Sequence, residues 1–256
     1  MNQSRLTPLI VLIILSGCNM NSSATDLANC DKIYQAIEQN TELNTPLQKA
    51  QAMQQQGISC VTTGMYDVWL ASYYQDAGDY PASVKIVQSA LDKITTDEAR
   101  ANLLQLMAEA ELKTGDEAKA IKIAEAASHD YPQYVPILGF LGEIAAKKED
   151  WSRSLEYSKR AYKIDGSAVS LISMATDLHQ LGRHEETVSA VYKALEMEPE
   201  RVGKITGVLE AIFSLAILNR RPEAAELAKK HIAANPNWRD NPTFAQAAME
   251  LGVAEQ

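Results

Sequence analysis

The stretch LGEIAAKKEDWSRSLEYSKRA, residues 141–161, decides the fold. Its central segment, KEDWSRS from Lys148, has the polar composition of a turn. Apolar residues at helical spacing lie on both sides of this turn. The stretch therefore predicts two consecutive helices that are joined by a short connection.

Four further turns of the same kind occur along the chain. They are AGDYPAS from Ala77, TGDEAKA from Thr114, LGRHEET from Leu181 and LNRRPEA from Leu218. The turn positions that align are Gly78, Gly115, Glu149, Gly182 and Asn219, with spacings of 37, 34, 33 and 37 residues. A recurring period of this length is typical of a repeat protein built from one supersecondary unit.

The period and the turns resemble the tetratricopeptide repeat (TPR), a helix–turn–helix unit of 34 residues. In that family a small residue opens the second helix, and a second small residue follows seven positions later. The first set here is Ser83, Ala120, Ser154, Thr187 and Ala224. The second set is Ala90, Ala127, Ala161 and Ala194, and the fifth repeat departs from it with His231. Small side chains at these positions let two antiparallel helices approach closely.

Two other features of the family are present in part. A proline, which stops a helix, ends the unit at Pro132, Pro199 and Pro236, whereas Thr95 and Gly166 stand in the other repeats. The leucine–glycine pair of the first helix is kept at Leu141-Gly142. In three other repeats alanine replaces the glycine, at Leu70-Ala71, Met107-Ala108 and Met174-Ala175. The resemblance covers about residues 64–238, and the fifth repeat keeps least of it.

The resemblance implies an all-α fold, a right-handed solenoid of about five TPR helix–turn–helix repeats with helical caps at both ends. We expect the solenoid at residues 64–238 and a C-terminal capping helix within residues 239–256. Residues 242–251 predict that helix, with Asn241 as its N-cap and Pro242 at its first position. Residues 27–63 predict an N-terminal helical pair without the repeat signature.

The first residues predict a signal peptide. The apolar run at residues 9–15 has seven residues, whereas a helix needs about 20 to cross a bilayer. LSGC, at residues 15–18, resembles the lipobox of bacterial lipoproteins. This resemblance implies a signal peptide at residues 1–17, acylation of the Cys18 thiol and a lipidated tether at residues 18–26. The alternative is a plain signal peptide with an incidental cysteine.

The residue after that cysteine and the net charge bear on location and partners. Asn19 follows Cys18, which by the same resemblance implies a lipid anchor in the outer membrane, facing the periplasm. Removal of residues 1–17 takes away only Arg5 among the charged side chains, so the mature charge is 23 − 33 = −10. This acidic balance disfavours nucleic acid as a partner and predicts membrane contact through the lipid anchor only.

Two cysteines remain in the mature chain, Cys30 and Cys60. An even number of cysteines in an oxidising compartment favours a disulfide. The bridge would close a loop of about 30 residues and stabilise the fold by about 3–4 kcal/mol in the chain-entropy account. The alternative is a pair of buried free thiols. No histidine lies close to either cysteine in the sequence, so we expect no metal there.

The sequence carries no motif for catalysis. It lacks a glycine-rich phosphate loop, an HExxH zinc helix and a GxSxG nucleophile elbow. Adjacent carboxylates such as Glu149-Asp150 are typical of a solvated surface. We therefore expect no enzymatic activity, no catalytic residue, no metal and no cofactor.

In the proteins that this chain resembles, the first helices line a concave groove that holds a peptide or a partner helix. Register maps the following inward residues onto it: Gln75, Asp76, Asn102, Gln105, Glu109, Lys113, Glu143, Lys147, Thr176, His179, Gln180, Leu209, Phe213 and Ile217. The groove would be polar with mixed charge and would become apolar near its C-terminal end. The alternative is an ordinary solvated face, with Phe213 packed against the capping helix.

One known form of TPR recognition is disfavoured. TPR domains that grip a chaperone's C-terminal carboxylate use basic and asparagine residues at fixed inward positions. Those positions here carry Gln105, Glu109, Gly139 and Glu143, and two carboxylates would repel such a ligand.

The resemblance thus predicts a lipid-anchored periplasmic scaffold that binds envelope proteins or peptide segments without chemistry. Two narrower functions are open: assembly of a pilus or secretion system at the outer membrane, and an adaptor for peptidoglycan enzymes. A third function, from a different class, is a periplasmic holdase chaperone. Length and repeat number favour assembly slightly, by analogy with lipoproteins of those systems.

Overall fold

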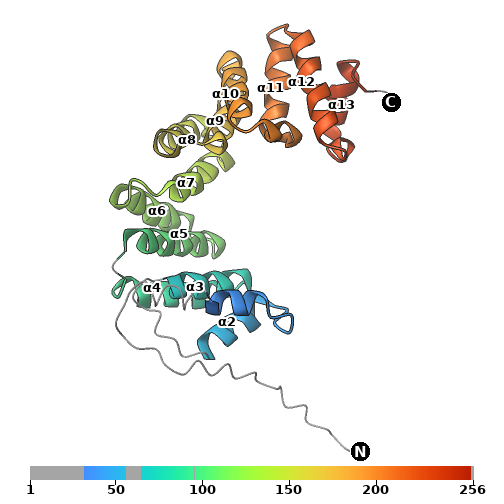
Figure 1. The fold of residues 1–256 in the computed structure, drawn as a ribbon. Helices are drawn as coiled ribbons and strands as arrows, with labels where there is room; N and C mark the ends of the chain where they lie inside the picture. Colours follow the sequence, from blue (N-terminus) through green and yellow to red (C-terminus); the bar gives the residue numbers. More distant parts are fainter. Residues whose placement is uncertain (1–31, 56–64, 95, 255–256) are drawn as a thin grey trace, which may run out of the picture.

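The computed structural model describes residues 32–55, 65–94 and 96–254, and it contains helices and no strands in these ranges. Five helix pairs follow one another, as the repeat pattern predicts (Figure 1). They are α3 (Met65–Asp76) with α4 (Tyr80–Leu91), α5 (Asp97–Lys113) with α6 (Glu117–Asp130), α7 (Val135–Lys147) with α8 (Trp151–Asp165), α9 (Ala168–Gln180) with α10 (His184–Met197), and α11 (Ile205–Ile217) with α12 (Arg221–Ala234). The all-α repeat fold is therefore confirmed.

Helices also precede and follow the five pairs. Residues 32–38 are helical, and α2 (Pro46–Gln55) packs against α3. At the other end, α13 (Pro242–Glu250) is capped by Asn241, whose Oδ1 accepts a hydrogen bond of 2.9 Å from the Phe244 amide. The array is curved, with α2 and α13 at its opposite ends (Figure 1).

The five aligned turn positions share one backbone conformation. Their φ angles are all positive: 77° at Gly78, 96° at Gly115, 59° at Glu149, 70° at Gly182 and 59° at Asn219. At each turn the same two hydrogen bonds close the first helix. In the fourth repeat, Gly182 N–H donates to the His179 carbonyl and Arg183 N–H to the Leu178 carbonyl, each at 2.9 Å. This is the Schellman motif, in which a left-handed residue lets the chain reverse.

The second helices begin in two ways. In the first three repeats an aspartate caps the helix: Asp79, Asp116 and Asp150 each accept a bond of 3.0–3.1 Å from the amide three residues later. The last two repeats have arginine at this position. Arg183 instead makes two bonds of 2.7 Å to Glu186 in the first turn. A carboxylate thus lies near every second-helix N-terminus, where the helix dipole favours it.

The small residues expected between paired helices are all buried, and the exception, His231, is buried as well. Its Nδ1 lies 2.7 Å from the carbonyl oxygen of Val202 and donates to it, since a carbonyl only accepts. Its ring lies 4.4 Å from the ring of Phe244, centroid to centroid. The 3-10 helix η1 (Pro199–Gly203), which carries Val202, packs against α12. The fifth repeat therefore fills the interhelical space with a hydrogen-bonded imidazole.

The two spacings of 37 residues have different structural causes. The first arises in α5, which has 17 residues, whereas the other first helices of the five pairs have 12 or 13. The second arises from η1, which is inserted before α11. Gly207 then redirects the chain with φ 87°, and a Cβ at this position would lie 2.5 Å from Ile172 Cδ1. The positive φ favours glycine here, and a larger residue would also have to displace the end of the Ile172 side chain.

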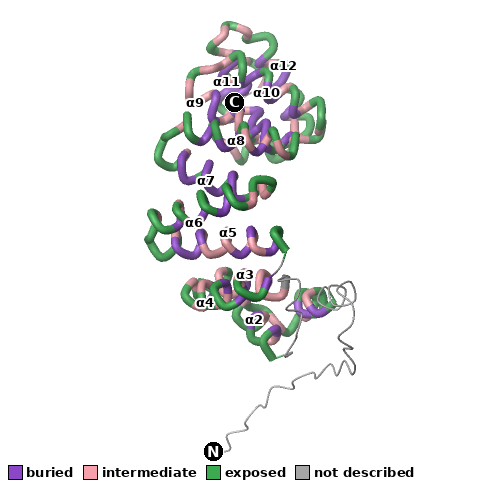
Figure 2. The backbone as a smooth tube through the Cα atoms, turned by 90° about the vertical axis from the view of Figure 1, so that its left-hand side faces the viewer, coloured by how far each residue is buried: buried purple, intermediate pink, exposed green. Residues whose placement is uncertain are grey.

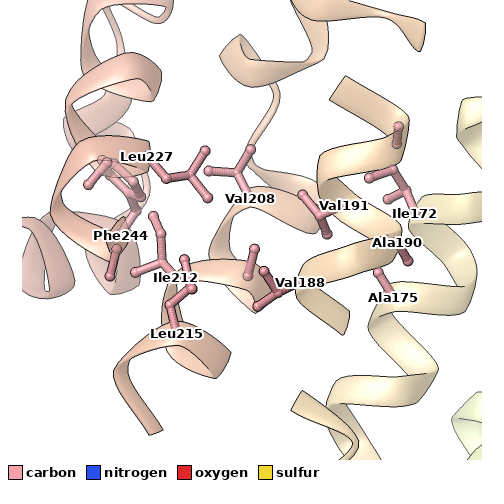
Figure 3. Packing of buried hydrophobic residues seen from close by; sticks show 14 of the residues in the cluster. Ile172, Ala175, Val188, Ala190, Val191, Val208, Ile212, Leu215, Leu227 and Phe244 are labelled. Carbon is pink, nitrogen blue, oxygen red and sulfur yellow. The ribbon is translucent and has the colours of Figure 1, made fainter. Parts of the chain in front are cut away.

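In the ranges that the structure describes, the apolar core is divided into four clusters along the array. The largest extends from α9 to α13, and Figure 3 shows Val188 and Val191 of α10 facing Val208 and Ile212 of α11. Figure 2 shows many buried residues along α7 and the helices that follow it. A polar contact lies between the two C-terminal clusters, where Ser158 Oγ of α8 donates to Asp177 Oδ2 of α9 at 2.8 Å. We call this contact the polar seam.

The C-terminal cap repeats the form of a first helix. After α13, Gly252 has φ 69°, and Val253 N–H donates to the Ala248 carbonyl at 3.0 Å, as in the five internal turns. Gly252 follows Asn219 by 252 − 219 = 33 residues, which equals the spacing between the turns at Glu149 and Gly182. The sequence pattern predicted a capping helix here, and the structure shows in addition that α13 is in register with the repeats.

Candidate partner-binding face

The residues expected to line a groove come from the first helices of the five pairs. α3 packs against α5, α5 against α7, and α9 against α11, so side chains of the first helices lie next to one another within two groups, α3–α5–α7 and α9–α11. We call the 14 positions mapped above, from Gln75 to Ile217, the first-helix face. The structure places some of them in internal contacts and leaves others exposed.

At the N-terminal end, Gln75 joins two repeats. Its Nε2 donates to the Leu106 carbonyl of α5 at 2.6 Å and to Ser83 Oγ of α4 at 3.3 Å. Gln75 therefore holds α3 against its neighbours, and its amide nitrogen is already used. The adjacent Asp76 is exposed and remains accessible to a partner.

In the second repeat the face is a hydrogen-bonded polar cluster. Gln105 Nε2 donates to Glu109 Oε1 at 2.8 Å, and the Tyr134 hydroxyl donates to Asn102 Oδ1 at 2.5 Å. Gln105 Oε1 is buried and has no hydrogen-bond partner within the described part of the protein. Burial raises the pKa of Tyr134 to about 12, with further contributions from the charges of Glu109 and Glu98.

The centre of the face carries charges of both signs. Lys113, Glu143 and Lys147 are exposed, and none of them takes part in an ion pair among the residues that the structure describes. Gly139 lies among them, and an added Cβ there would find no atom within 4 Å. This region is therefore open and holds charges without intramolecular partners.

Near the C-terminal end, two histidines meet at one serine. The Nδ1 atoms of His179 and His184 lie 2.9 and 3.2 Å from Ser214 Oγ. The hydroxyl has one hydrogen, so at least one ring donates its Nδ1–H to it. Burial, together with the charge of His184, lowers the pKa of His179. The pair therefore favours the neutral imidazole at position 179.

The apolar part of the face lies beside these histidines. Phe213 stacks on His179 with ring centroids 6.4 Å apart, and Ile217 is 56% exposed. Thr176 bonds to the Ile172 carbonyl at 3.3 Å within its own helix, Gln180 is exposed, and Leu209 is half-buried. Val169, also 56% exposed, was not among the mapped residues although it begins the same helix as His179.

A cavity of about 370 Å³ adjoins the polar cluster of the second repeat. Its walls are Asp97 and Glu98 of α5, Asp130 at the end of α6, and residues 131–134 of the following loop. The Tyr134–Asn102 hydrogen bond links it to the first-helix face. None of the lining residues was predicted from the sequence. The available signal was the first spacing of 37 residues, which places extra chain at this point.

Three expected sites lie outside the described residues: the lipidation site Cys18 and the pair Cys30 and Cys60. Within the described ranges, no three or more His, Cys, Asp or Glu side chains are grouped so that they could hold a metal ion. Nor does any helix in those ranges combine the length and the apolar character that a bilayer crossing requires.

Comparison with solved structures identifies the fold. The C-terminal part of a TPR repeat-containing protein from Cytophaga hutchinsonii matches 81% of this chain and 78% of its own, with a TM-score of 0.60 and 13% identity. YrrB, described as a TPR protein with an unusual peptide-binding site, matches 86% of this chain and 99% of its own, with a TM-score of 0.56 and 17% identity.

A third match is the hetero-tetramer Cut9–Hcn1 of the APC/C, which covers 88% of this chain and 46% of the matched chain, with a TM-score of 0.58 and 9% identity. No protein-family model and no curated protein matches the sequence. At these identities the likeness shows the fold alone, which is that of TPR proteins.

Proposed function

We propose that this TPR-fold protein is a scaffold whose first-helix face binds a segment of another protein. The observation that carries the proposal is the open centre of the face. There Lys113, Glu143 and Lys147 are exposed and have no ion-pair partner in the described part of the chain, on helices that pack against neighbouring helices. Rigid display of unpaired polar groups favours binding, because little conformational entropy is lost on association.

Two similar structures support this proposal by analogy. One is a TPR protein with a peptide-binding site, and another forms a hetero-tetramer with a second protein. The apolar end of the face, with Phe213 and the exposed Ile217, would give a bound segment a hydrophobic anchor. Buried apolar contacts commonly supply most of the affinity at such interfaces, and charged groups supply specificity.

For location, we propose a lipid anchor at Cys18 in the outer membrane, with the protein facing the periplasm. The lipobox-like sequence LSGC and Asn19 support this assignment. Confinement at a membrane surface raises the effective concentration near envelope partners. The protein would then gather components there, in pilus or secretion-system assembly or, as the alternative, around peptidoglycan enzymes.

Crosslinking in intact cells, followed by mass spectrometry, tests the scaffold. The natural chain is compared with Glu109→Lys/Glu143→Lys, which reverses two charges on the first-helix face. The matched control is Glu196→Lys/Glu200→Lys, which makes the same charge change at exposed residues on α10 and η1. We expect the natural chain and the control to recover one envelope complex and the face variant to lose it.

The recovered proteins distinguish the narrower functions. A secretin-type subunit supports assembly of a pilus or secretion channel, and hydrolases or synthases of peptidoglycan support the cell-wall function. If the face variant recovers the same complex as the natural chain, binding by this face is wrong. If the natural chain recovers no stable partner but slows aggregation of an unfolded client, the holdase function replaces the scaffold.

The anchor and the disulfide have separate tests. Cys18→Ser should leave an uncleaved, unacylated precursor. A mature, membrane-bound product from this variant would contradict the lipobox assignment.

Thiol counting on the oxidised mature protein tests the pair Cys30 and Cys60, and two free thiols would contradict a Cys30–Cys60 bridge.

A further inference from the structure

The cavity beside the second repeat is built by a local departure from the repeat. α5 has 17 residues, and its additional first turn contributes Asp97 and Glu98 to the cavity wall. The opposite wall is the end of α6 and the loop at residues 131–134. The volume of about 370 Å³ falls in the range in which proteins bind small groups.

The charge of the cavity is of one sign. Among the residues that the structure describes, its lining includes three carboxylates, Asp97, Glu98 and Asp130, and no lysine or arginine. Within the described ranges, no lysine or arginine lies within ion-pair distance of these carboxylates; Asp130 meets only the exposed ring of His129 at 3.1 Å. A cation that entered would therefore not compete with an internal ion pair.

One basic side chain contacts the lining, and its hydrogen bonds go to a hydroxyl and a carbonyl rather than to the carboxylates. Arg100 Nε donates to the Tyr131 hydroxyl at 3.0 Å, and its Nη1 donates to the Ile94 carbonyl at 3.2 Å. Arg100 thus fixes Tyr131 in place. The Asn102 bond fixes Tyr134 in the same way, so both aromatic walls are held before any ligand arrives.

The helix dipole accounts for only part of this arrangement. Acidic residues in the first turn of a helix stabilise it, and this effect alone explains the presence of Asp97 and Glu98. The dipole does not explain Asp130, because this residue ends a different helix, where a negative charge is unfavourable. Nor does it explain the two tyrosines in the cavity wall. Aromatic rings together with carboxylates are the chemistry that receives a lysine ammonium or an arginine guanidinium.

We infer that this cavity binds a lysine or arginine side chain of the protein segment that occupies the first-helix face. The inference rests on the proposed scaffold function and adds the chemistry of its partner: a basic residue placed to reach the α5–α7 side of the face. The hydrogen bond between Tyr134 and Asn102 joins a wall of the cavity to a residue of that face.

The test uses the full-length protein in detergent, labelled with 3-fluorotyrosine and observed by ¹⁹F NMR. The probe is the peptide acetyl-Gly-Arg-Gly-amide, and its neutral match is the same peptide with citrulline in place of arginine. Tyr131→Phe and Tyr134→Phe serve only to assign the two resonances. We expect saturable shifts of these resonances with the arginine peptide and none with the citrulline peptide.

Variants then locate the site. Asp97→Asn/Glu98→Gln should weaken binding of the arginine peptide at least tenfold. Asp130→Asn should weaken it severalfold without harm to folding, because it removes a carboxylate from a helix C-terminus. The matched control is Glu196→Gln/Glu200→Gln, two exposed carboxylates elsewhere, which should leave the affinity unchanged.

Equal shifts with the citrulline peptide, or no shift with either peptide, would overturn the inference. So would loss of binding in the control variant. These outcomes are separable from failure of the scaffold itself. If crosslinking finds a complex that depends on the first-helix face but the arginine peptide does not bind, only the cavity's assignment fails. If the peptide binds but no such complex exists, the scaffold fails.

Discussion

Glu149 holds a backbone conformation that glycine adopts more readily. Its φ of 59° matches the turns at Gly78, Gly115 and Gly182, where the lack of a Cβ makes this conformation inexpensive. A non-glycine residue in the left-handed region costs about 1–2 kcal/mol, because Cβ approaches the following carbonyl oxygen. The third repeat therefore keeps the geometry of the turn at an energetic cost.

Replacement of Glu149 by glycine should remove the energetic cost of the left-handed backbone conformation. We expect Glu149→Gly to raise the free energy of unfolding by about 1 kcal/mol, as measured by urea denaturation. The reciprocal change, Gly182→Ala, introduces a Cβ at φ 70° with open space around it, and should lower the stability by a similar amount. If neither variant differs from the natural chain, backbone strain at these turns is negligible.

Asp177 is a second residue under strain, here electrostatic. It is buried in the polar seam, where Ser158 donates to its carboxylate. Burial raises the pKa of Asp177 above its ordinary value, and hydrogen bonds from Ser154 and Ser158 offset part of this rise. The folded state thus disfavours the ionised form. The resulting penalty is present above the folded pKa and disappears as pH falls below the unfolded pKa.

The sign of this effect predicts how Asp177→Asn behaves. At pH 7 the variant should be more stable than the natural chain, because asparagine accepts the serine hydrogen bond without a buried charge. The advantage should shrink as pH falls through the folded pKa and vanish below about pH 3.9, the ordinary value for aspartate. Urea midpoints from pH 3.5 to 8 measure it; an advantage that grows at low pH would contradict it.

Among the elements, α12 departs most clearly from the repeat pattern. The other four second helices have alanine where α12 has His231. A comparison of repeats alone would suggest alanine here as an improvement. The structure indicates the opposite, because the imidazole donates a hydrogen bond to the Val202 carbonyl and packs against Phe244 of α13.

We therefore expect His231→Ala to lower the free energy of unfolding by about 2–4 kcal/mol, from the cavity and the carbonyl left without a partner. Thermal or urea denaturation measures this loss. His129→Ala, at an exposed histidine on α6, is the control and should change stability by less than about 0.5 kcal/mol. A stabilised His231→Ala variant would show that α12 follows the repeat pattern after all.

At the scale of single elements, the local sequence was sufficient to predict the turns, the helix pairs and the small residues buried between the helices. The turn at Glu149 was aligned correctly although it lacks glycine, because the helices on both sides kept their period. The long α5 and the inserted η1 were visible only as two spacings of 37 residues. Their consequences, the cavity and the place for His231, depend on contacts between distant segments, which periodicity does not encode.

The candidate face was predictable as a set of positions but not as a set of free side chains. Register identified Gln75 and Asn102, yet their hydrogen bonds to Leu106 and Tyr134 arise from packing between neighbouring repeats. Val169 was missed because it lies in the first turn of α9, ahead of the residues that register assigned.

For the whole molecule, the division of the apolar core determines how far along the array a destabilising substitution has an effect. One apolar cluster joins α5 to α8 and another joins α9 to α13, with the polar seam between them. In repeat proteins each unit contacts only its neighbours, so stability is transmitted through successive interfaces. An interface with a buried ionisable carboxylate couples its two sides less strongly than an apolar one.

This division makes a prediction for hydrogen exchange. Leu215→Ala, in the C-terminal cluster, should cost about 2–5 kcal/mol and sharply reduce amide protection in α9–α13. Protection in α5–α7 should change by less than about twofold. Leu103→Ala, in the N-terminal half, is the reciprocal control and should spare α9–α13. Uniform loss of protection along the array would show that the molecule unfolds as one cooperative unit.

The polar seam also has a mechanical consequence. A chain tethered at one end and loaded at the other carries the same tension through each joint in series, so the weakest joint sets the force that it withstands. The joint of α8 against α9, where Ser158 meets Asp177, contains a buried carboxylate whose ionisation the fold disfavours. We therefore expect the force needed to separate this joint to be higher at acidic pH, where the Asp177 carboxyl is neutral, than at neutral pH.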